Sequence, residues 1–239
     1  LHARLRHRSI PSQLEGGRES ENEKKRLLDA GCGNGMIAYQ AYTEGYTATG
    51  VSNDPEEIAK CREFYHEYLG VDDDKLWFQV LDLYELDGPE KHYDEIVCSE
   101  VLEHLMNDEL VCAKLFDMLK PGGVLHVTVP NAAHPYNANH ELDEDESGGH
   151  VRPGYTRESL NCLLVSQGFE IISLRGLGGS LRQAFNVWIK NIQMAWGKAW
   201  GVPIFALSLP FWACDKPCPE LPYCIYARAR KPCGDRNSS

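Results

Sequence analysis

The segment Arg26–Ala38, RLLDAGCGNGMIA, constrains the fold more than any other part of the chain. A short apolar run leads into Asp29, three glycines then alternate with other residues, and apolar residues return at helical spacing. This order predicts a β-strand, a tight turn and the start of an α-helix. Glycine accepts backbone torsions that other residues resist, and it lets the main chain approach a ligand where helix N–H groups point outward. The sequence therefore predicts a nucleotide-binding turn.

The spacing of the glycines separates two classes of nucleotide site. A dinucleotide-binding turn reads G-x-G-x-x-G or G-x-G-x-x-A, with an acidic residue about twenty positions later. Here the third glycine, Gly35, comes one residue early, and Met36 stands at the dinucleotide position. Taken alone, the turn also fits an ordinary doubly wound fold. Asp29 followed by G-x-G-x-G nevertheless resembles motif I of the class I S-adenosylmethionine-dependent methyltransferases, of the type that acts on small molecules.

Strand and helix patterns alternate along the chain, which predicts parallel strands joined by right-handed crossovers. The expected fold class is α/β, a Rossmann-like doubly wound sheet that is mostly parallel with an antiparallel last strand. A helical, apolar insert precedes that strand. We expect strands at 27–30, 47–51, 76–81, 95–99, 124–129, 169–174 and 223–229, and helices at 36–44, 55–69, 108–119 and 156–167.

Two parts of unequal size are expected. Residues 1–23 have little apolar periodicity and predict a flexible N-terminal arm, and residues 24–239 predict a single methyltransferase domain. Within it, residues 131–155 are expected to form an active-site loop, because so long a loop is uncommon in a compact domain and is usually functional. The insert at 176–222 contains an uncharged run, 199–214, that is too short and too broken by proline to span a bilayer.

That uncharged run leaves three roles open. It can pack on the domain as a lid, line an apolar substrate pocket, or make peripheral contact with a membrane. The net charge of −11 argues against nucleic acid as a partner, because phosphate contacts need clustered lysine and arginine. We therefore expect a small-molecule or lipid-like substrate; the oligomeric state is not indicated.

The nine cysteines are odd in number and scattered, which predicts free thiols in a reducing, cytoplasmic location without a signal peptide. The last four do not show the paired C-x₂-C spacing of zinc sites; they are Cys214, Cys218, Cys224 and Cys233. The acid run at 141–146 shows no fixed ligand spacing either and reads as a solvated surface. No metal site is predicted.

Polar residues follow each expected parallel strand, and ligands of such sheets bind beyond the carboxyl ends of the strands. The resemblance, which covers about residues 26–175, implies that Asp82 accepts a hydrogen bond from the adenine amino group and that Leu83 offers its N–H to the ring. A strand-ending aspartate that only caps the next segment is the alternative. The segments CSEVLEHL and LKPGGVLHVTVPN also resemble that family. The expected cofactor-binding residues are Asp29, Gly31, Cys32, Gly33, Gly35, Ser52, Asn53, Asp82, Leu83, Ser99 and Glu100.

One position departs from the family pattern. The second strand of these enzymes usually ends on an acid that binds both ribose hydroxyls, and here that place holds Ser52. A neutral hydroxyl binds less strongly than a charged acceptor. Asn53 or Asp54 is an alternative ribose ligand.

Three histidines are candidates for acid–base catalysis because imidazole titrates near neutral pH: His104, His134 and His150. Each one alone also fits a structural or surface role.

The resemblance implies an enzyme that uses S-adenosyl-L-methionine, releases S-adenosyl-L-homocysteine and moves the methyl group by direct displacement. A base is needed only if the accepting atom must lose a proton. Two alternatives remain open: a non-catalytic S-adenosylmethionine-binding module and a nicotinamide-dependent oxidoreductase.

Overall fold

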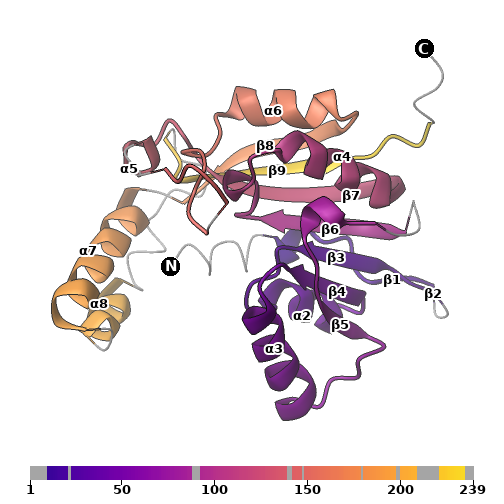
Figure 1. Ribbon diagram of the computed structural model, residues 1–239, viewed down its shortest axis with the longest axis horizontal. Helices are drawn as coiled ribbons and strands as arrows, with labels where there is room; N and C mark the ends of the chain where they lie inside the picture. Colours follow the sequence, from indigo (N-terminus) through magenta and orange to yellow (C-terminus); the bar gives the residue numbers. More distant parts are fainter. Residues whose placement is uncertain are drawn as a thin grey trace.

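The computed structural model describes residues 10–20, 23–87, 92–138, 142–146, 148–178, 180–197, 200–208 and 221–234 (Figure 1). Its centre is a seven-stranded sheet in the order β5-β4-β3-β6-β7-β9-β8. The strands from β5 to β7 are mutually parallel, and β9 runs antiparallel to both of its neighbours. This is the mostly parallel, doubly wound sheet that the alternating pattern predicts. The strands are β3 (Arg26–Ala30), β4 (Thr47–Ser52), β5 (Leu76–Val80), β6 (Tyr93–Ser99), β7 (Leu119–Pro130), β8 (Glu170–Leu177) and β9 (Cys224–Arg230).

Helices cover both faces of the sheet (Figure 1). One face packs its alternate strand residues, such as Leu27 and Phe78, against α2 and α3, and the other packs residues such as Ile96 and Val127 against α4 and α6. The helices are α2 (Met36–Thr43), α3 (Pro55–Arg62), α4 (Asp108–Met118) and α6 (Arg157–Ser166). The two cores hold the strands in place, so the loops that follow them have fixed starting points.

Helix starts follow ordinary capping rules. Asp54 caps α3 by accepting from the Glu56 N–H at 2.8 Å, and Pro55 takes the first helical position. Thr156 and Ser159 form a capping box at the start of α6. The segment expected as one helix to residue 69 changes to a π-helical turn, η2, at Glu63–Tyr68.

The described part of the segment that we expected to be a flexible arm, residues 10–20 and 23, contacts the domain. Ile10 is completely buried against the α2 face, and a short hairpin forms between β1 (Arg18–Ser20) and β2 (Glu23–Lys24). Glu15 pairs with Arg228 of β9 at 2.7 Å. These contacts attach the segment to the domain. Residues 1–9 lie outside the described part.

A buried polar network lies within the sheet, and no sequence pattern predicted it. The Glu95 carboxylate is 2.9 Å from His126 Nε2 and accepts hydrogen bonds from the Tyr46 hydroxyl and the Glu15 N–H. His126 Nδ1 lies 2.8 Å from the Tyr226 hydroxyl. Burial by itself raises the pKa of Glu95, but these hydrogen bonds and the charge of His126 outweigh it and lower the pKa.

The apolar insert contains two helices, α7 (Ser180–Trp196) and α8 (Gly201–Ser208), which contact each other and stand away from the sheet (Figure 1). Several aromatic side chains of this pair are exposed, among them Trp188, Trp196 and Trp200. None of the described helices is long and apolar enough to cross a membrane. Cys214, Cys218 and the end of the 199–214 run lie outside the described residues, and no disulfide joins two of the seven described cysteines.

Candidate active site

The glycine turn follows β3 and is held in a left-handed conformation at all three glycines. The φ angles are +79° at Gly31, +51° at Gly33 and +72° at Gly35, where side chains are strongly disfavoured. A Cβ on Gly31 would lie 2.3 Å from Val101 Cγ2, and one on Gly35 would lie 2.7 Å from the Phe78 ring. These two glycines are therefore required by packing as well as by torsion.

Gly33 differs, because a Cβ there would meet no atom within 4 Å. The N–H groups of Gly31 and Cys32 both donate to the Val51 carbonyl, at 2.9 and 2.8 Å, and so join the turn to β4. Within the described chain, no acceptor is recorded for the N–H groups of Gly33 and Asn34. The turn thus offers an open backbone surface with two N–H donors at Gly33 and Asn34.

Asp29 and Cys32 are buried below that surface. Asp29 Oδ2 accepts from the Ala38 N–H at 3.1 Å, which joins the end of β3 to α2. Burial raises the pKa of Asp29 to about 7, against the lowering effect of that hydrogen bond. A hydrogen bond with Cys61 and burial raise the pKa of the Cys32 thiol well above its usual range. These two side chains shape the turn rather than face outward.

The end of β4 carries a carboxylate that the sequence pattern missed. The buried Ser52 hydroxyl donates to Glu57 Oε2 at 2.8 Å and accepts from the Asp54 N–H at 3.2 Å. Asn53 is exposed, and Asp54 is engaged as the cap of α3. Glu57 belongs to the first turn of α3, so the carboxylate beside the end of β4 comes from the following helix and not from the strand. An acid five residues after the strand end is the sequence signal that could have identified it.

Asp82 and Leu83 follow β5 at the same edge of the sheet. Asp82 is exposed, and its Oδ1 accepts from the Tyr84 N–H at 2.9 Å, capping the turn η3 (Leu83–Glu85). Asp82 therefore caps the following turn through Oδ1, as the alternative interpretation expected, and its Oδ2 is the oxygen that a ligand could contact. The Leu81 N–H donates to the Ser52 carbonyl at 2.9 Å, which fixes the β5 loop beside the β4 loop.

The loop after β6 lies beside the glycine turn, because β3 and β6 are neighbouring strands at the point where the strand order changes direction. Ser99 is bonded to Thr128 at 2.8 Å between their hydroxyl oxygens, and Glu100 has a positive φ of 57°. Val101 packs against Gly31. We use the name carboxyl rim for the loops that follow β3, β4, β5, β6 and β7.

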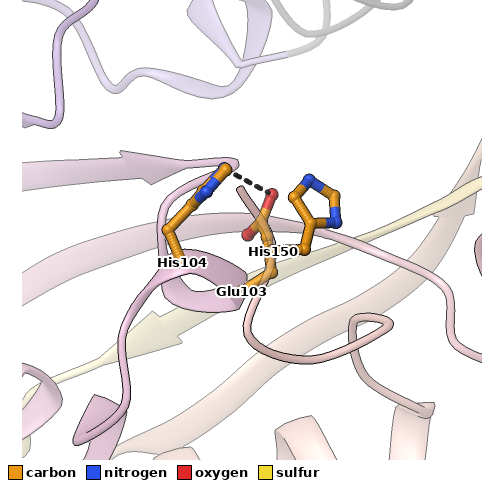
Figure 2. Close-up of side chains that lie close together, drawn as sticks. All are labelled: Glu103, His104 and His150. Atoms are coloured by element: carbon orange, nitrogen blue, oxygen red, sulfur yellow. Dashed lines mark ion pairs between the residues drawn. The ribbon is translucent and has the colours of Figure 1, made fainter. Parts of the chain in front are cut away.

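Two of the three predicted catalytic histidines come together on this rim, and they do so with Glu103 (Figure 2). His104 is the last residue of η4 (Leu102–His104), and its ring meets that of His150 edge to face at 4.7 Å. Glu103 is fully buried, and its Oε1 is 3.9 Å from His104 Nε2.

The third histidine, His134, lies elsewhere, beside the short helix α5 (Pro135–Ala138). Its ring contacts Tyr223 edge to face at 5.5 Å, and burial lowers its pKa from the ordinary value. It is not part of the Glu103, His104 and His150 group. His140 and Glu141, which belong to the same loop, lie outside the described residues.

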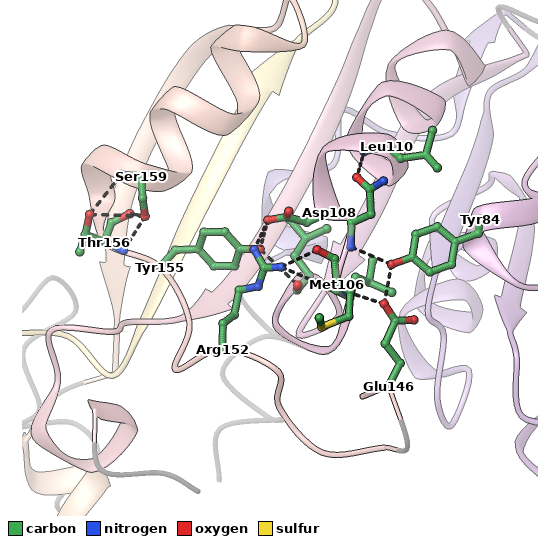
Figure 3. A network of polar contacts seen from close by, with 12 residues as sticks. Tyr84, Met106, Asp108, Leu110, Glu146, Arg152, Tyr155, Thr156 and Ser159 are labelled. Carbon is green, nitrogen blue, oxygen red and sulfur yellow. Dashed lines mark hydrogen bonds and ion pairs between the residues drawn. The ribbon is translucent and has the colours of Figure 1, made fainter. Parts of the chain in front are cut away.

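A polar network fastens the 142–155 segment to the β6 loop and to α4 (Figure 3). The Arg152 guanidinium donates to Asp108 and to the carbonyls of Leu105 and Met106, and the Tyr155 hydroxyl donates to Asp108. At the other end, Glu146 accepts from the Tyr84 hydroxyl and the Met106 N–H. Glu146 therefore holds the loop in place, whereas the sequence suggested only a solvated acid.

The parallel sheet and its glycine turn agree with the proteins to which this chain is similar. A family model described as a methyltransferase domain matches residues 3–174, which is most of the chain. The mitochondrial ubiquinone biosynthesis O-methyltransferase of Mus musculus is 25% identical over 177 residues, covering 71% of this chain and 48% of that protein. The sterol 24-C-methyltransferase of Debaryomyces hansenii is 29% identical over 157 residues, covering 63% and 41%. The chain spans about half the length of the curated relatives it matches.

Solved structures show the same fold. Phosphoethanolamine N-methyltransferase 2 of Haemonchus contortus, in complex with S-adenosyl-L-methionine, has a TM-score of 0.65 at 18% identity, covering 97% of this chain and 52% of that one. The [4+2]-cyclase SpnF has a TM-score of 0.64 at 23% identity, covering 98% and 83%. Sheet, glycine turn and family model together establish that the chain belongs to the class I S-adenosylmethionine-dependent methyltransferase family.

Proposed function

We propose that this chain transfers a methyl group from S-adenosyl-L-methionine to a hydroxyl group of a small, largely apolar acceptor. The observation that carries the proposal is the open backbone at Gly33, which lies on the same rim as the Ser52–Glu57 pair and Asp82. Three neighbouring parallel strands end there, so the three loops meet on one edge.

The residues present fit the cofactor part by part. The N–H groups of Gly33 and Asn34 suit a carboxylate, because backbone donors at a helix start bind anions. Glu57, held by Ser52, suits the ribose hydroxyls, and Asp82 with the Leu83 N–H suits the adenine edge. The bound cofactor supplies a sulfonium that carries the methyl group.

The acceptor side supports a small ring-bearing or lipid-like molecule. The relatives named above act, by their names, in ubiquinone biosynthesis and on sterols. In this chain, exposed tryptophans on α7 and just before α8 offer apolar surface. His104 belongs to the same loop as Val101, which packs on Gly31, and its ring contacts His150; we therefore assign these two imidazoles to orienting the acceptor hydroxyl or taking its proton.

A second function is the alternative. Ser52 stands where the family usually has the ribose acid, and one structural neighbour is a [4+2]-cyclase, so this fold does not by itself imply methyl transfer. A module that binds the cofactor without turnover would have the same rim.

The test uses labelled S-adenosylmethionine with phenolic, sugar and sterol-like acceptors, read by mass spectrometry. We expect a methylated product from a phenolic or lipid-like acceptor. Asp82→Ala is expected to weaken S-adenosylhomocysteine binding tenfold or more, as when a hydrogen bond to a charged acceptor worth about 1.5–3 kcal/mol is lost. Cofactor binding without product across the panel would support the binding module instead, and unchanged affinity in Asp82→Ala would place the adenine elsewhere.

A further inference from the structure

We propose that Glu103, His104 and His150 bind a divalent transition-metal ion, and that this ion holds the acceptor hydroxyl. The inference rests on the proposed function for the identity of the acceptor, but the metal site itself does not. One ligand atom from each of the three residues lies within 4.8 Å of the other two (Figure 2). The sequence did not suggest this set, because His150 reaches the other two only through the fold.

The tautomer of His104 suits metal binding. Its Nδ1 lies 2.8 Å from the Gly149 carbonyl, which can only accept a hydrogen bond. Nδ1 must therefore carry the proton, and in the neutral ring the lone pair is on Nε2. Nε2 is the atom that faces Glu103. A backbone carbonyl that fixes the ring in this way is the usual outer partner of a metal-bound histidine.

The distance between His104 and Glu103 suits two ligands of one ion. Their atoms are 3.9 Å apart, which is too long for a hydrogen bond. Metal–nitrogen and metal–oxygen bonds of about 2.0–2.2 Å place two ligands of one ion up to about 4.2 Å apart. The remaining separations are no longer than 4.8 Å, so binding one ion requires the side chains to move together by no more than a few tenths of an ångström each. Glu103 is also fully buried, and a positive ion offsets the cost of a carboxylate removed from water.

His150 is held in place from both sides. The Val151 N–H donates to the Glu103 carbonyl at 3.0 Å, and the His150 carbonyl accepts from the Asp143 N–H at 2.8 Å. Arg152 anchors the same segment to the β6 loop. The backbone on each side of His150 is thus fixed, so the ring approaches the other two ligands without further ordering of the loop.

The donor set selects the metal. Two imidazoles with one carboxylate favour Zn²⁺, Fe²⁺ or Mn²⁺ and leave coordination positions open, whereas Mg²⁺ and Ca²⁺ prefer mainly oxygen ligands. An open position is what a bound hydroxyl needs. Metal binding lowers the pKa of that hydroxyl. The O–H bond then breaks and the proton leaves to water. The oxygen keeps its electron pair, which forms the bond to the methyl carbon as the carbon–sulfur pair returns to sulfur.

The first experiment measures metal binding to chelator-treated protein. Electron paramagnetic resonance detects the binding of Mn²⁺, and calorimetry detects the binding of Zn²⁺. We expect one ion per chain in the wild type. Glu103→Gln should weaken binding at least 100-fold and His150→Ala at least 10-fold, while His134→Ala, which changes a histidine outside the group, should leave it within twofold. No stoichiometric ion in the wild type, or unchanged binding in both Glu103→Gln and His150→Ala, overturns the proposal.

A second measurement keeps this inference separate from the proposed function. S-adenosylhomocysteine affinity should stay within about threefold in His150→Ala, which also shows that the variant is folded. Methyl transfer by wild type should fall at least 10-fold after chelation and return with Mn²⁺ or Zn²⁺. Full transfer by metal-free protein overturns the metal's role while the methyltransferase assignment stands. Specific metal binding without any methyl transfer supports the site and counts against the proposed function.

Discussion

The two sides of the carboxyl rim are built in different ways. On the cofactor side, formed by residues 31–35, 52–57 and 82–84, two side-chain contacts join residues a few positions apart, Ser52 to Glu57 and Asp82 to Tyr84, and a third brings Tyr65 to the Asn34 carbonyl from 31 positions away. On the histidine side, formed by residues 99–108 and 142–155, they join residues 45 and 44 positions apart, as in His104 to Gly149 and Asp108 to Arg152. The cofactor side therefore depends in part on local torsion and capping rules, whereas the histidine side depends on the docking of a distant loop.

The largest effect is expected from Gly31→Ala on the cofactor side. The substitution would place a side chain at a left-handed torsion and a Cβ 2.3 Å from Val101 Cγ2. Together these should lower the free energy of unfolding by about 2–5 kcal/mol. Chemical denaturation measures the loss. The matched control is Gly33→Ala, which has a positive φ but open space and should cost only about 1–2 kcal/mol. Equal losses in the two variants would show that Val101 does not press on the turn.

The next largest effect is expected from a substitution that weakens the histidine side. Arg152→Met removes charged hydrogen bonds to Asp108 and to two carbonyls, and should lower the free energy of unfolding by about 1.5–3 kcal/mol. S-adenosylhomocysteine affinity should change less than threefold, while the KM for the acceptor rises. Arg230→Met, at an exposed strand end, is the control. A large loss of cofactor affinity in Arg152→Met would mean that the two sides are not independent.

A pH-dependent effect is expected at Asp29, beneath the cofactor side. Its folded-state pKa of about 7 lies above the unfolded value of 3.8, so the folded protein holds the proton more tightly. This contribution is full below pH 4 and is lost as the pH rises to about 7. Asp29→Asn should therefore gain about 1–3 kcal/mol over the wild type between pH 4 and pH 7.5. Asp117→Asn changes an exposed helix position, and its free energy of unfolding should show the same pH dependence as that of the wild type. A difference in unfolding free energy between Asp29→Asn and the wild type that does not change with pH would contradict the prediction.

The smallest effect sharpens the assignment of the ribose acid. Glu57→Gln should weaken S-adenosylhomocysteine binding about 3- to 10-fold, because an amide is a poorer acceptor than a carboxylate. The analogue that lacks the ribose 2′-hydroxyl should show a smaller loss. Glu56→Gln, the exposed neighbour paired with Lys60, is the matched control. Identical affinities in both variants would remove Glu57 from the cofactor side.

What the sequence could predict follows the same division. The glycine turn, the individual strands and the Asp82 turn depend on residues that are close in the chain, and we expected them on one rim because the sheet is parallel. Glu57 was not among the expected residues because the family pattern places the acid at a strand end, whereas Glu57 contacts Ser52 from the first turn of α3.

The histidine side could be predicted only as a set of candidates. His104 and His150 were named, but not their contact, and His134 was grouped with them although it lies against Tyr223. The contact depends on Arg152 and Glu146 fixing a long loop, and no periodicity encodes which distant partner such a loop meets. The buried Glu95–His126 pair was missed for the same reason: each residue sits singly in an apolar strand.

The most direct test of the account is calorimetric titration of the wild-type protein with S-adenosylhomocysteine and, separately, with NAD⁺. If the rim formed by Gly33, Glu57 and Asp82 holds adenosine with its attached amino acid, S-adenosylhomocysteine binds with one site per chain and NAD⁺ gives no saturable heat. Saturable binding of NAD⁺, or no binding of S-adenosylhomocysteine, would contradict it.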